Sequence, residues 1–276
     1  MTHIRRAAVA GFFYPEDPGE LQGVIQHLLA DPPPSATVCG TPKALIVPHA
    51  GYIYSGPVAA SAYARLKTMA ARTMRVVLIG PCHRVPLRGL AVSSADAFET
   101  PLGIVPVDRQ AVEDLRTLPQ VKELDAAHAN EHSLEVHLPF LQQILGPFAL
   151  VPIVVGSATA EEVADVLERL WGGSETLIVI SSDLSHFHDY ETARRLDALT
   201  CRAIEALDPG KIGFEQACGG VPVGGLLIVA RRRGLEVTTL DLRNSGDTAG
   251  DRRRVVGYGA WMFSRPADHR DEGQRV

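Results

Sequence analysis

The chain has 276 residues, of which 46% are hydrophobic and 21% are charged, and its formal net charge is −5 at pH 7. This composition is typical of a globular protein and excludes an intrinsically disordered chain. The small negative charge argues against non-specific nucleic-acid binding. Four cysteines without a C-x-x-C pair exclude a disulfide scaffold and a four-cysteine zinc knuckle.

Short apolar runs alternate with amphipathic helical patterns along the chain. In chain order, the sequence predicts a helix over 20–29, a strand over 43–47, a helix over 56–69 with Ser55 as its N-cap, a strand over 75–79, a helix over 109–118 capped by Asp108, a helix over 131–145, a strand over 150–155, a helix over 160–170, a strand over 176–180, a helix over 191–207, and strands over 236–242 and 255–263. This order predicts an α/β fold, with a mostly parallel central sheet and helices on both faces. We expect one domain over 1–264 and a polar C-terminal tail over 265–276.

The apolar runs are too short to cross a membrane, because the longest, at 148–156 and 221–230, fall well below about 20 residues. The N-terminus imitates a short signal peptide, with Arg5 and Arg6 before an apolar run over 7–14. It has no small-x-small cleavage site, so we interpret it as mature protein and expect a cytoplasmic location without membrane contact.

Titratable side chains follow three of the predicted strands. His49 comes after the strand over 43–47, His83 after the next strand, and Asp183 and His186 after the strand over 176–180. Open α/β sheets bind ligands beyond the carboxyl ends of parallel strands, which meet at one edge. These four residues are therefore predicted to share a site. The alternative is that each histidine only caps a strand end by hydrogen bonding.

Two imidazoles suit iron, copper, zinc or nickel, and such a site needs a third protein ligand. The candidates are the carboxylates of Asp183, Glu131 and Glu135 and the thiolates of Cys218 and Cys82. An isolated cysteine is more often a small buried hydrophobe. The residues by themselves leave this choice open.

The start of the predicted helix over 131–145 carries further polar groups. Glu131 and Glu135 are four residues apart and are expected to share a face, while Glu131 and His132 are expected to face the substrate or support the ligands. His128 and His132 also have an i, i+4 spacing, but the H-E-x-x-H motif is absent. His137 is expected at the surface or at its boundary.

Two other classes of site receive little support. The glycines at 219–220 and 224–225 form neither G-x-G-x-x-G nor G-x-x-x-x-G-K-[ST], so no nucleotide is expected. Ser181 and Ser182 near Asp183 and His186 imitate a hydrolase triad, but there is no G-x-S-x-G elbow.

Ordered motifs along nearly the whole chain resemble those of the Memo family, protein B of the AmmeMemoRadiSam system. They are AVAGFFYP at 8–15, PHAGYIYSG at 48–56, GPCH at 80–83, TPLG at 100–103, EHSLE at 131–135, SSDLSH at 181–186, ACG at 217–219, NSGD at 244–247 and VGY at 256–258. The resemblance implies a fold similar to the catalytic subunits of class III extradiol dioxygenases.

The resemblance also implies which residues hold a metal. Its trio of two histidines and a cysteine carries over onto His49, His83 and Cys218, and its catalytic pair onto Asp183 and His186. The implied cofactor is Fe(II) or copper, with zinc as a further option. Two pocket residues, Glu131 and His132, are expected beside them, together with Tyr54 of the PHAGYIYSG motif.

Three functional hypotheses follow from this reading. The first is a dioxygenase-like redox enzyme acting on a small molecule, with His186 as general acid and base. The second is a non-catalytic component that binds an AMMECR-like protein and a radical-SAM enzyme. The third is a metal-dependent hydrolase, which a zinc-bound water would favour.

Overall fold

The structure is a computed structural model that describes residues 2–30, 40–69 and 72–266. Its strands are β1 Ile4–Arg5, β2 Pro42–Val47, β3 Arg75–Pro81, β4 Leu90–Val92, β5 Ala97–Thr100, β6 Gly103–Pro106, β7 Val121–Glu123, β8 Ala149–Val155, β9 Thr176–Ser181, β10 His186–His188, β11 Glu236–Asn244 and β12 Val255–Ser264. Its α-helices are α1 Pro18–Ala30, α2 Tyr52–Tyr63, α3 Arg109–Leu115, α4 Ala126–Ala129, α5 Leu138–Leu145, α6 Ala160–Leu170, α7 Tyr190–Glu205, α8 Gly220–Arg232 and α9 Ser245–Thr248. Short 3-10 helices cover Ala64–Met69, Glu135–His137 and Pro209–Lys211.

In the described residues, one nine-stranded sheet forms the centre of the molecule. Its order is β10-β12-β2-β9-β3-β8-β4-β7, and β11 pairs with β12 outside this path. The four central strands β2, β9, β3 and β8 are parallel, whereas β12 and β4 flank them in antiparallel orientation. β11 and β12 pair antiparallel. The connection between them is short and contains α9, which suffices because antiparallel neighbours need no long crossover.

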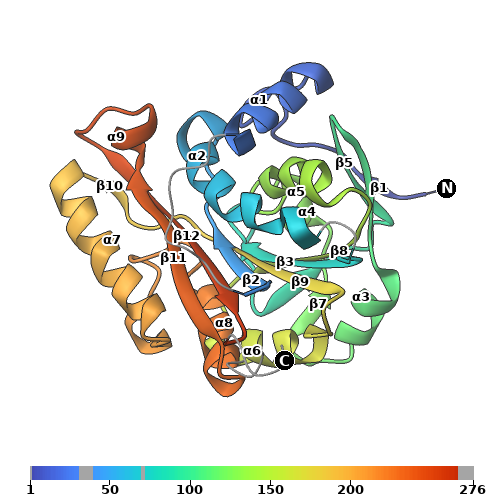
Figure 1. The fold of residues 1–276 in the computed structure, drawn as a ribbon. Coiled ribbons are helices and arrows are strands. Elements are labelled where there is room, and N and C mark those ends of the chain that lie inside the picture. The colour runs from blue at the N-terminus through green and yellow to red at the C-terminus, as the bar shows by residue number, and fades with distance from the viewer. Residues whose placement is uncertain (1, 31–39, 70–71, 267–276) are drawn as a thin grey trace, which may run out of the picture.

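Helices cover both faces of the central strands, as Figure 1 shows, with α1, α2 and α5 on one face and α6 and α8 on the other. The α/β fold with a large sheet flanked by helices is thus confirmed. α7 packs instead on the β11–β12 hairpin. Within residues 2–30, 40–69 and 72–266, no helix is long and apolar enough to cross a membrane.

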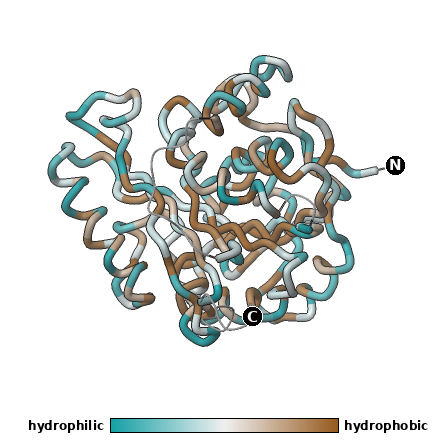
Figure 2. The backbone as a smooth tube through the Cα atoms, viewed as in Figure 1, coloured by the Kyte–Doolittle hydropathy of each residue, from teal (hydrophilic) through white to brown (hydrophobic). Residues whose placement is uncertain are grey.

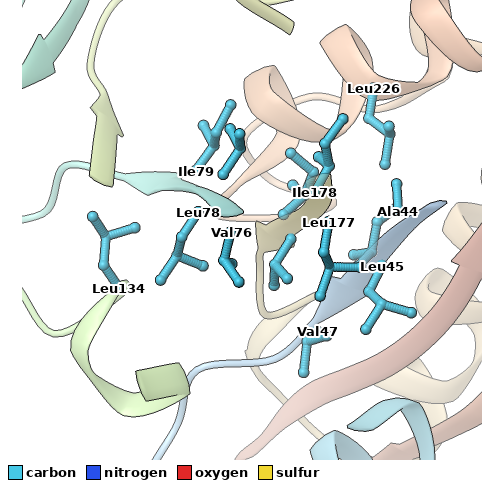
Figure 3. Packing of buried hydrophobic residues seen from close by; sticks show 14 of the residues in the cluster. Ala44, Leu45, Val47, Val76, Leu78, Ile79, Leu134, Leu177, Ile178 and Leu226 are labelled. Carbon is cyan, nitrogen blue, oxygen red and sulfur yellow. The ribbon is translucent and has the colours of Figure 1, made fainter. Parts of the chain in front are cut away.

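The central strands are apolar on both faces because helices bury both of them. Figure 2 shows this as a hydrophobic centre with more hydrophilic outer helices. In Figure 3, neighbouring residues of one strand point to opposite faces: in β3, Leu78 lies on the side of Leu134, whereas Ile79 lies on the opposite side, as does Ile178 of β9 beside Leu226 from α8. The loops at the carboxyl edge therefore extend from strands that are buried on both faces.

Two predicted helices begin elsewhere in the structure. α2 starts at Tyr52 with Gly51 as its N-cap residue, and the Ser55 hydroxyl donates to the Ala50 carbonyl instead of capping a helix. α5 starts at Leu138, which places Pro139 in its first turn. A helix running from 131 would hold that proline in its interior, where it removes a backbone hydrogen bond and its ring crowds the preceding turn.

Other sequence predictions are confirmed at the level of single residues. The Asp108 carboxylate accepts from the backbone N of Ala111 and caps α3. α6 spans Ala160–Leu170, as predicted, and begins with a capping box formed by Thr159 and Glu162. Of the predicted polar tail, the part beyond residue 266 lies outside the described residues.

Candidate metal centre

The strand order brings three chain segments together at the carboxyl edge of the sheet. β9 lies between β2 and β3, so Ser181 at its end sits between the loops that follow the two outer strands. His49 comes two residues after β2, and His83 comes two residues after β3. The two histidines, 34 positions apart in the chain by their numbers, therefore meet above β9.

A third imidazole joins them from the segment before α5. One ring nitrogen from each of His49, His83 and His132 lies within 4.8 Å of the others. The His83 and His132 rings stack with centroids 4.8 Å apart, and the His49 ring meets them edge-on at 5.3 and 5.4 Å. We call these three residues the histidine cluster.

Glu131 orients the His83 ring. Its carboxylate accepts from the backbone N of His83 at 2.6 Å and pairs with Nδ1 of the same ring at 2.9 Å. Burial would raise the pKa of Glu131, but the hydrogen bonds and charge of His83 outweigh it and lower this pKa to about 2. The ionised carboxylate holds the proton of His83 on Nδ1, so Nε2 is left with a lone pair for a metal.

His49 is held at both its backbone and its ring. Its backbone N donates to the Asp183 carboxylate at 2.8 Å, and its Nδ1 lies 2.6 Å from the Ser181 hydroxyl. Only 2% of His49 is exposed. Burial, together with the positive charge that His132 and His83 would carry, lowers the pKa of His49 well below its usual value. The imidazole is therefore neutral, as a metal ligand must be.

Cys218 lies next to His49, although it is not one of the three groups of the histidine cluster. Its Sγ is 3.4 Å from Nε2 of His49 and accepts from the backbone N of Asp183 at 3.3 Å. Burial and the charge of Asp183 raise the pKa of the Cys218 thiol to about 12. Gly219 allows this approach, since a Cβ at that position would stand 2.5 Å from the Ser181 carbonyl oxygen.

The remaining carboxylates divide between the site and the core. Asp183 is buried, its Oδ2 lies 3.9 Å from Nε2 of His49, and burial raises its pKa to about 7. Glu135 points away, because its carboxylate pairs with Arg5 and accepts from the Tyr14 hydroxyl at 2.6 Å. The expectation that Glu131 and Glu135 share a helix face is therefore wrong, since the chain between them is not α-helical.

The other predicted site residues, His186, Tyr54 and Cys82, come from three different segments. His186 begins β10, where burial and the charge of His83 lower its pKa. Tyr54 stands in the first turn of α2, with 41% of its surface exposed. The thiol of Cys82 donates to the Val85 carbonyl at 3.4 Å within its own loop.

His137 corrects a further expectation, because it is not at the surface. Only 1% of it is exposed, and its Nε2 lies 2.9 Å from the same Ser181 hydroxyl that contacts His49. Its Nδ1 lies 2.7 Å from the Tyr63 hydroxyl. The sequence showed apolar neighbours on both sides of His137, and this burial signal could have identified it.

Comparison with known proteins identifies the family of this chain. The family model described as Memo-like protein matches residues 5–262. The chain belongs to the Memo family. It is 38% identical over 275 residues to a MEMO1 family protein of Aquifex aeolicus, covering 94% of this chain and 99% of that one. A MEMO1 family protein of Thermotoga maritima is 37% identical over 274 residues, covering 92% and 97% of the two chains.

A solved structure also resembles this Memo-family chain. It is the uncharacterized protein JW3007 from Escherichia coli K12, with a TM-score of 0.48 and 14% sequence identity. The match covers 79% of this chain and 98% of that chain.

The residues of the histidine cluster fit a metal ion. Three imidazoles in reach of one point are a donor set for zinc, copper or iron. Nδ1 of His132 is buried and finds no hydrogen-bond partner in the part of the chain that the structure describes, although it lies 3.3 Å from a Glu131 oxygen. The sequence assigned His132 to the pocket wall, and its place among the ring nitrogens makes it a candidate ligand as well.

Proposed function

We propose that this Memo-family chain is a redox metalloprotein of dioxygenase-like type that acts on a small molecule with Fe(II) or copper. The observation that carries the proposal is the convergence of three ring nitrogens within 4.8 Å at the carboxyl edge of the sheet. Open α/β sheets place their ligands at this edge. When bound, such a metal supplies the electron-transfer chemistry that side chains lack.

His49, His83 and Cys218 are our proposed ligands. Two ligands of one tetrahedral metal, with bonds near 2.0 Å to nitrogen and 2.3 Å to sulfur, lie about 3.5 Å apart. The Sγ of Cys218 and Nε2 of His49 are separated by 3.4 Å. This spacing supports the thiol as a ligand, with His132 beside it as a further donor or as part of the substrate pocket.

The other residues of the site hold and move protons. His186 would accept a proton from a bound substrate, because its lowered pKa keeps the imidazole neutral near pH 7. Asp183 fixes the backbone at His49 through its 2.8 Å hydrogen bond. Glu131 and Tyr54 would border the substrate. A free thiol at the centre suits a reducing compartment, and we propose the cytoplasm as its location.

The test is metal analysis of protein purified without oxygen, combined with measurement of O2 consumption. We expect iron or copper near one equivalent and O2 uptake that depends on it. A stable zinc content with no O2 uptake would contradict the redox function. The matched variants are His49→Ala, which should lose the metal, and His27→Ala, which removes a histidine from α1 and should keep it.

A metal-dependent hydrolase is the second candidate, and the histidine cluster itself favours it. Three imidazoles with one open position are a common ligand set for catalytic zinc, which activates a bound water. Zinc in the purified protein, together with ester or amide hydrolysis that chelators abolish, would decide for this candidate.

A binding component is the third candidate, with an AMMECR-like protein and a radical-SAM enzyme as the proposed partners. An apolar groove of about 900 Å³ lies between the loop over 11–15, α1 and α2. Phe12 and Ile53 line it and are 88% and 68% exposed. Phe13 also lines this groove, and its ring centroid lies 4.9 Å from that of His132. Co-purification of the three proteins, lost in Phe12→Ser, would support this function.

A further inference from the structure

We propose that Ser181 is a positioning residue for the metal centre, which holds His49 in the tautomer with its proton on Nδ1 and its lone pair on Nε2. The inference rests on the proposed metal function, since that lone pair is the one facing Cys218 and the cluster. It adds to that function a device that prepares the ligand before any metal arrives.

The hydroxyl of Ser181 has three partners. Its Oγ lies 2.6 Å from the Ser133 carbonyl oxygen, 2.6 Å from Nδ1 of His49 and 2.9 Å from Nε2 of His137. A backbone carbonyl can only accept, so the single hydroxyl proton goes to Ser133. The hydroxyl then has only lone pairs left, and both imidazole nitrogens must donate to it.

A neutral imidazole carries one proton, so a ring that donates from one nitrogen has a lone pair on the other. His49 and His137 are 2% and 1% exposed, and such burial disfavours the charged imidazolium form of both rings. With its proton on Nε2, neutral His137 accepts at Nδ1, where the Tyr63 hydroxyl lies at 2.7 Å. With its proton on Nδ1, His49 has a bare Nε2 directed at the metal centre.

The surroundings of Ser181 are closely packed and keep solvent away from these three contacts. Ser181 and Tyr63 have no exposed surface, and His49 and His137 are 2% and 1% exposed, so water does not compete for these bonds. Gly80 makes the close approach possible, because a Cβ there would stand 2.9 Å from Oγ of Ser133 and 3.1 Å from Cβ of Ser181. The geometry is therefore built into the packing of β3 and β9.

The two histidines at the strand ends are prepared by different partners. A carboxylate, Glu131, holds the proton on Nδ1 of His83, and a hydroxyl, Ser181, does the same for His49. Partners of this kind fix the orientation and tautomer of metal-binding imidazoles, and their loss costs 10- to 100-fold in metal affinity.

The experiment reads the tautomer directly in metal-free protein. Long-range ¹H–¹⁵N correlation spectra of ¹⁵N-histidine-labelled protein distinguish a protonated nitrogen from a bare one. We expect His49 protonated on Nδ1 and bare at Nε2. Ser181→Ala should give a mixture of both tautomers and weaken Co(II) binding by about 10- to 100-fold.

The matched control is Ser61→Ala. It removes another buried hydroxyl that donates to a backbone carbonyl, that of Val58 in α2. Its histidine spectrum and Co(II) affinity should equal those of the parent protein.

Two results would overturn the inference. One is a proton on Nε2 of His49 in the metal-free parent protein, a measurement that requires no variant to fold. The other is an unchanged His49 spectrum in folded Ser181→Ala. If His49 shows the expected tautomer but the protein binds no metal, the role of Ser181 is supported. That result would contradict only the proposed metal function.

Discussion

The thiol of Cys218 lies 3.4 Å from Nε2 of His49, although the two are 169 positions apart in the chain. The contact forms because the loop before α8 passes over the carboxyl end of β9, where Gly219 permits close approach to the Ser181 carbonyl. The site thus offers one soft sulfur beside several imidazoles. If the proposed metal site includes this sulfur, the combination would set which metals it prefers.

The first prediction concerns this sulfur. Cys218→Asp replaces a soft donor by a hard one, so Cu(I) binding should fall at least tenfold relative to Fe(II). Anaerobic titration of both metals measures the ratio. Cys201→Ser is the matched control, because that thiol is buried beside Thr239 at 3.4 Å and lies away from the cluster. An unchanged ratio in folded Cys218→Asp would exclude the thiol as a ligand.

The second prediction separates a ligand from an acid–base group. His49→Ala should remove most of the metal, because it deletes one of the clustered ring nitrogens. His186→Ala should keep the metal and lower turnover by 10²- to 10⁴-fold, the usual contribution of a general acid or base. Equal metal loss in the two variants would contradict the assignment of His186.

The third prediction concerns the pH dependence of stability through Glu131. Its pKa is lowered from 4.5 to about 2, so the folded protein favours the ionised form. The resulting stabilisation is fully present above pH 4.5 and is lost as the pH falls towards 2. Glu131→Gln should lower the free energy of unfolding by about 1–3 kcal/mol at pH 7. The reason is that the NH2 group of the amide cannot accept hydrogen bonds from the buried backbone donors that face this carboxylate.

Denaturant unfolding at pH 7 and at pH 3 tests this expectation. The difference in unfolding free energy between parent and Glu131→Gln should shrink at the lower pH. A difference that is constant across this range would show that Glu131 is not the titrating group.

The fourth prediction compares two neighbouring arginines. Arg5 pairs with Glu135 where both side chains are nearly inaccessible, 5% and 0% exposed. Arg5→Met leaves a buried carboxylate without its charged partner and should destabilise the protein by about 3–5 kcal/mol. Arg6→Met breaks a pair whose arginine is 73% exposed, and it should cost less than about 1 kcal/mol. Thermal and denaturant unfolding of both variants measure these costs.

The fifth prediction concerns the backbone beside the thiol. Gly219→Ala places a Cβ 2.5 Å from the Ser181 carbonyl oxygen, so the Cys218 loop must move. Metal affinity should fall together with stability. Gly23→Ala is the control: its Cβ meets nothing within 4 Å, and in α1 it should stabilise the protein by about 0.5–1 kcal/mol. Equal effects of the two substitutions on metal binding would contradict this account.

The sequence by itself determined the features that depend on local pattern. Buried apolar runs with turn residues after them defined the central strands, and His49 and His83 stood at their ends. The helical pattern predicted the span of α6, and the position of Asp108 before a helix predicted its cap, because such a bond joins residues only three apart. The motifs that resemble the Memo family were likewise readable as strings, and the family is confirmed.

Only the tertiary structure decided what depends on contacts between distant segments. Pro139 lies in the first turn of α5, so the residues before it are not part of that helix. In this segment His132 lies in the histidine cluster, and Glu135 pairs with Arg5. His137 is buried, and its ring contacts the hydroxyl of Ser181 at the end of β9. The spacing of apolar residues along the chain does not predict such contacts, since they depend on the order in which the strands pair. The strand ends were visible in the sequence, and the packing between β2, β9 and β3 decided which groups they meet.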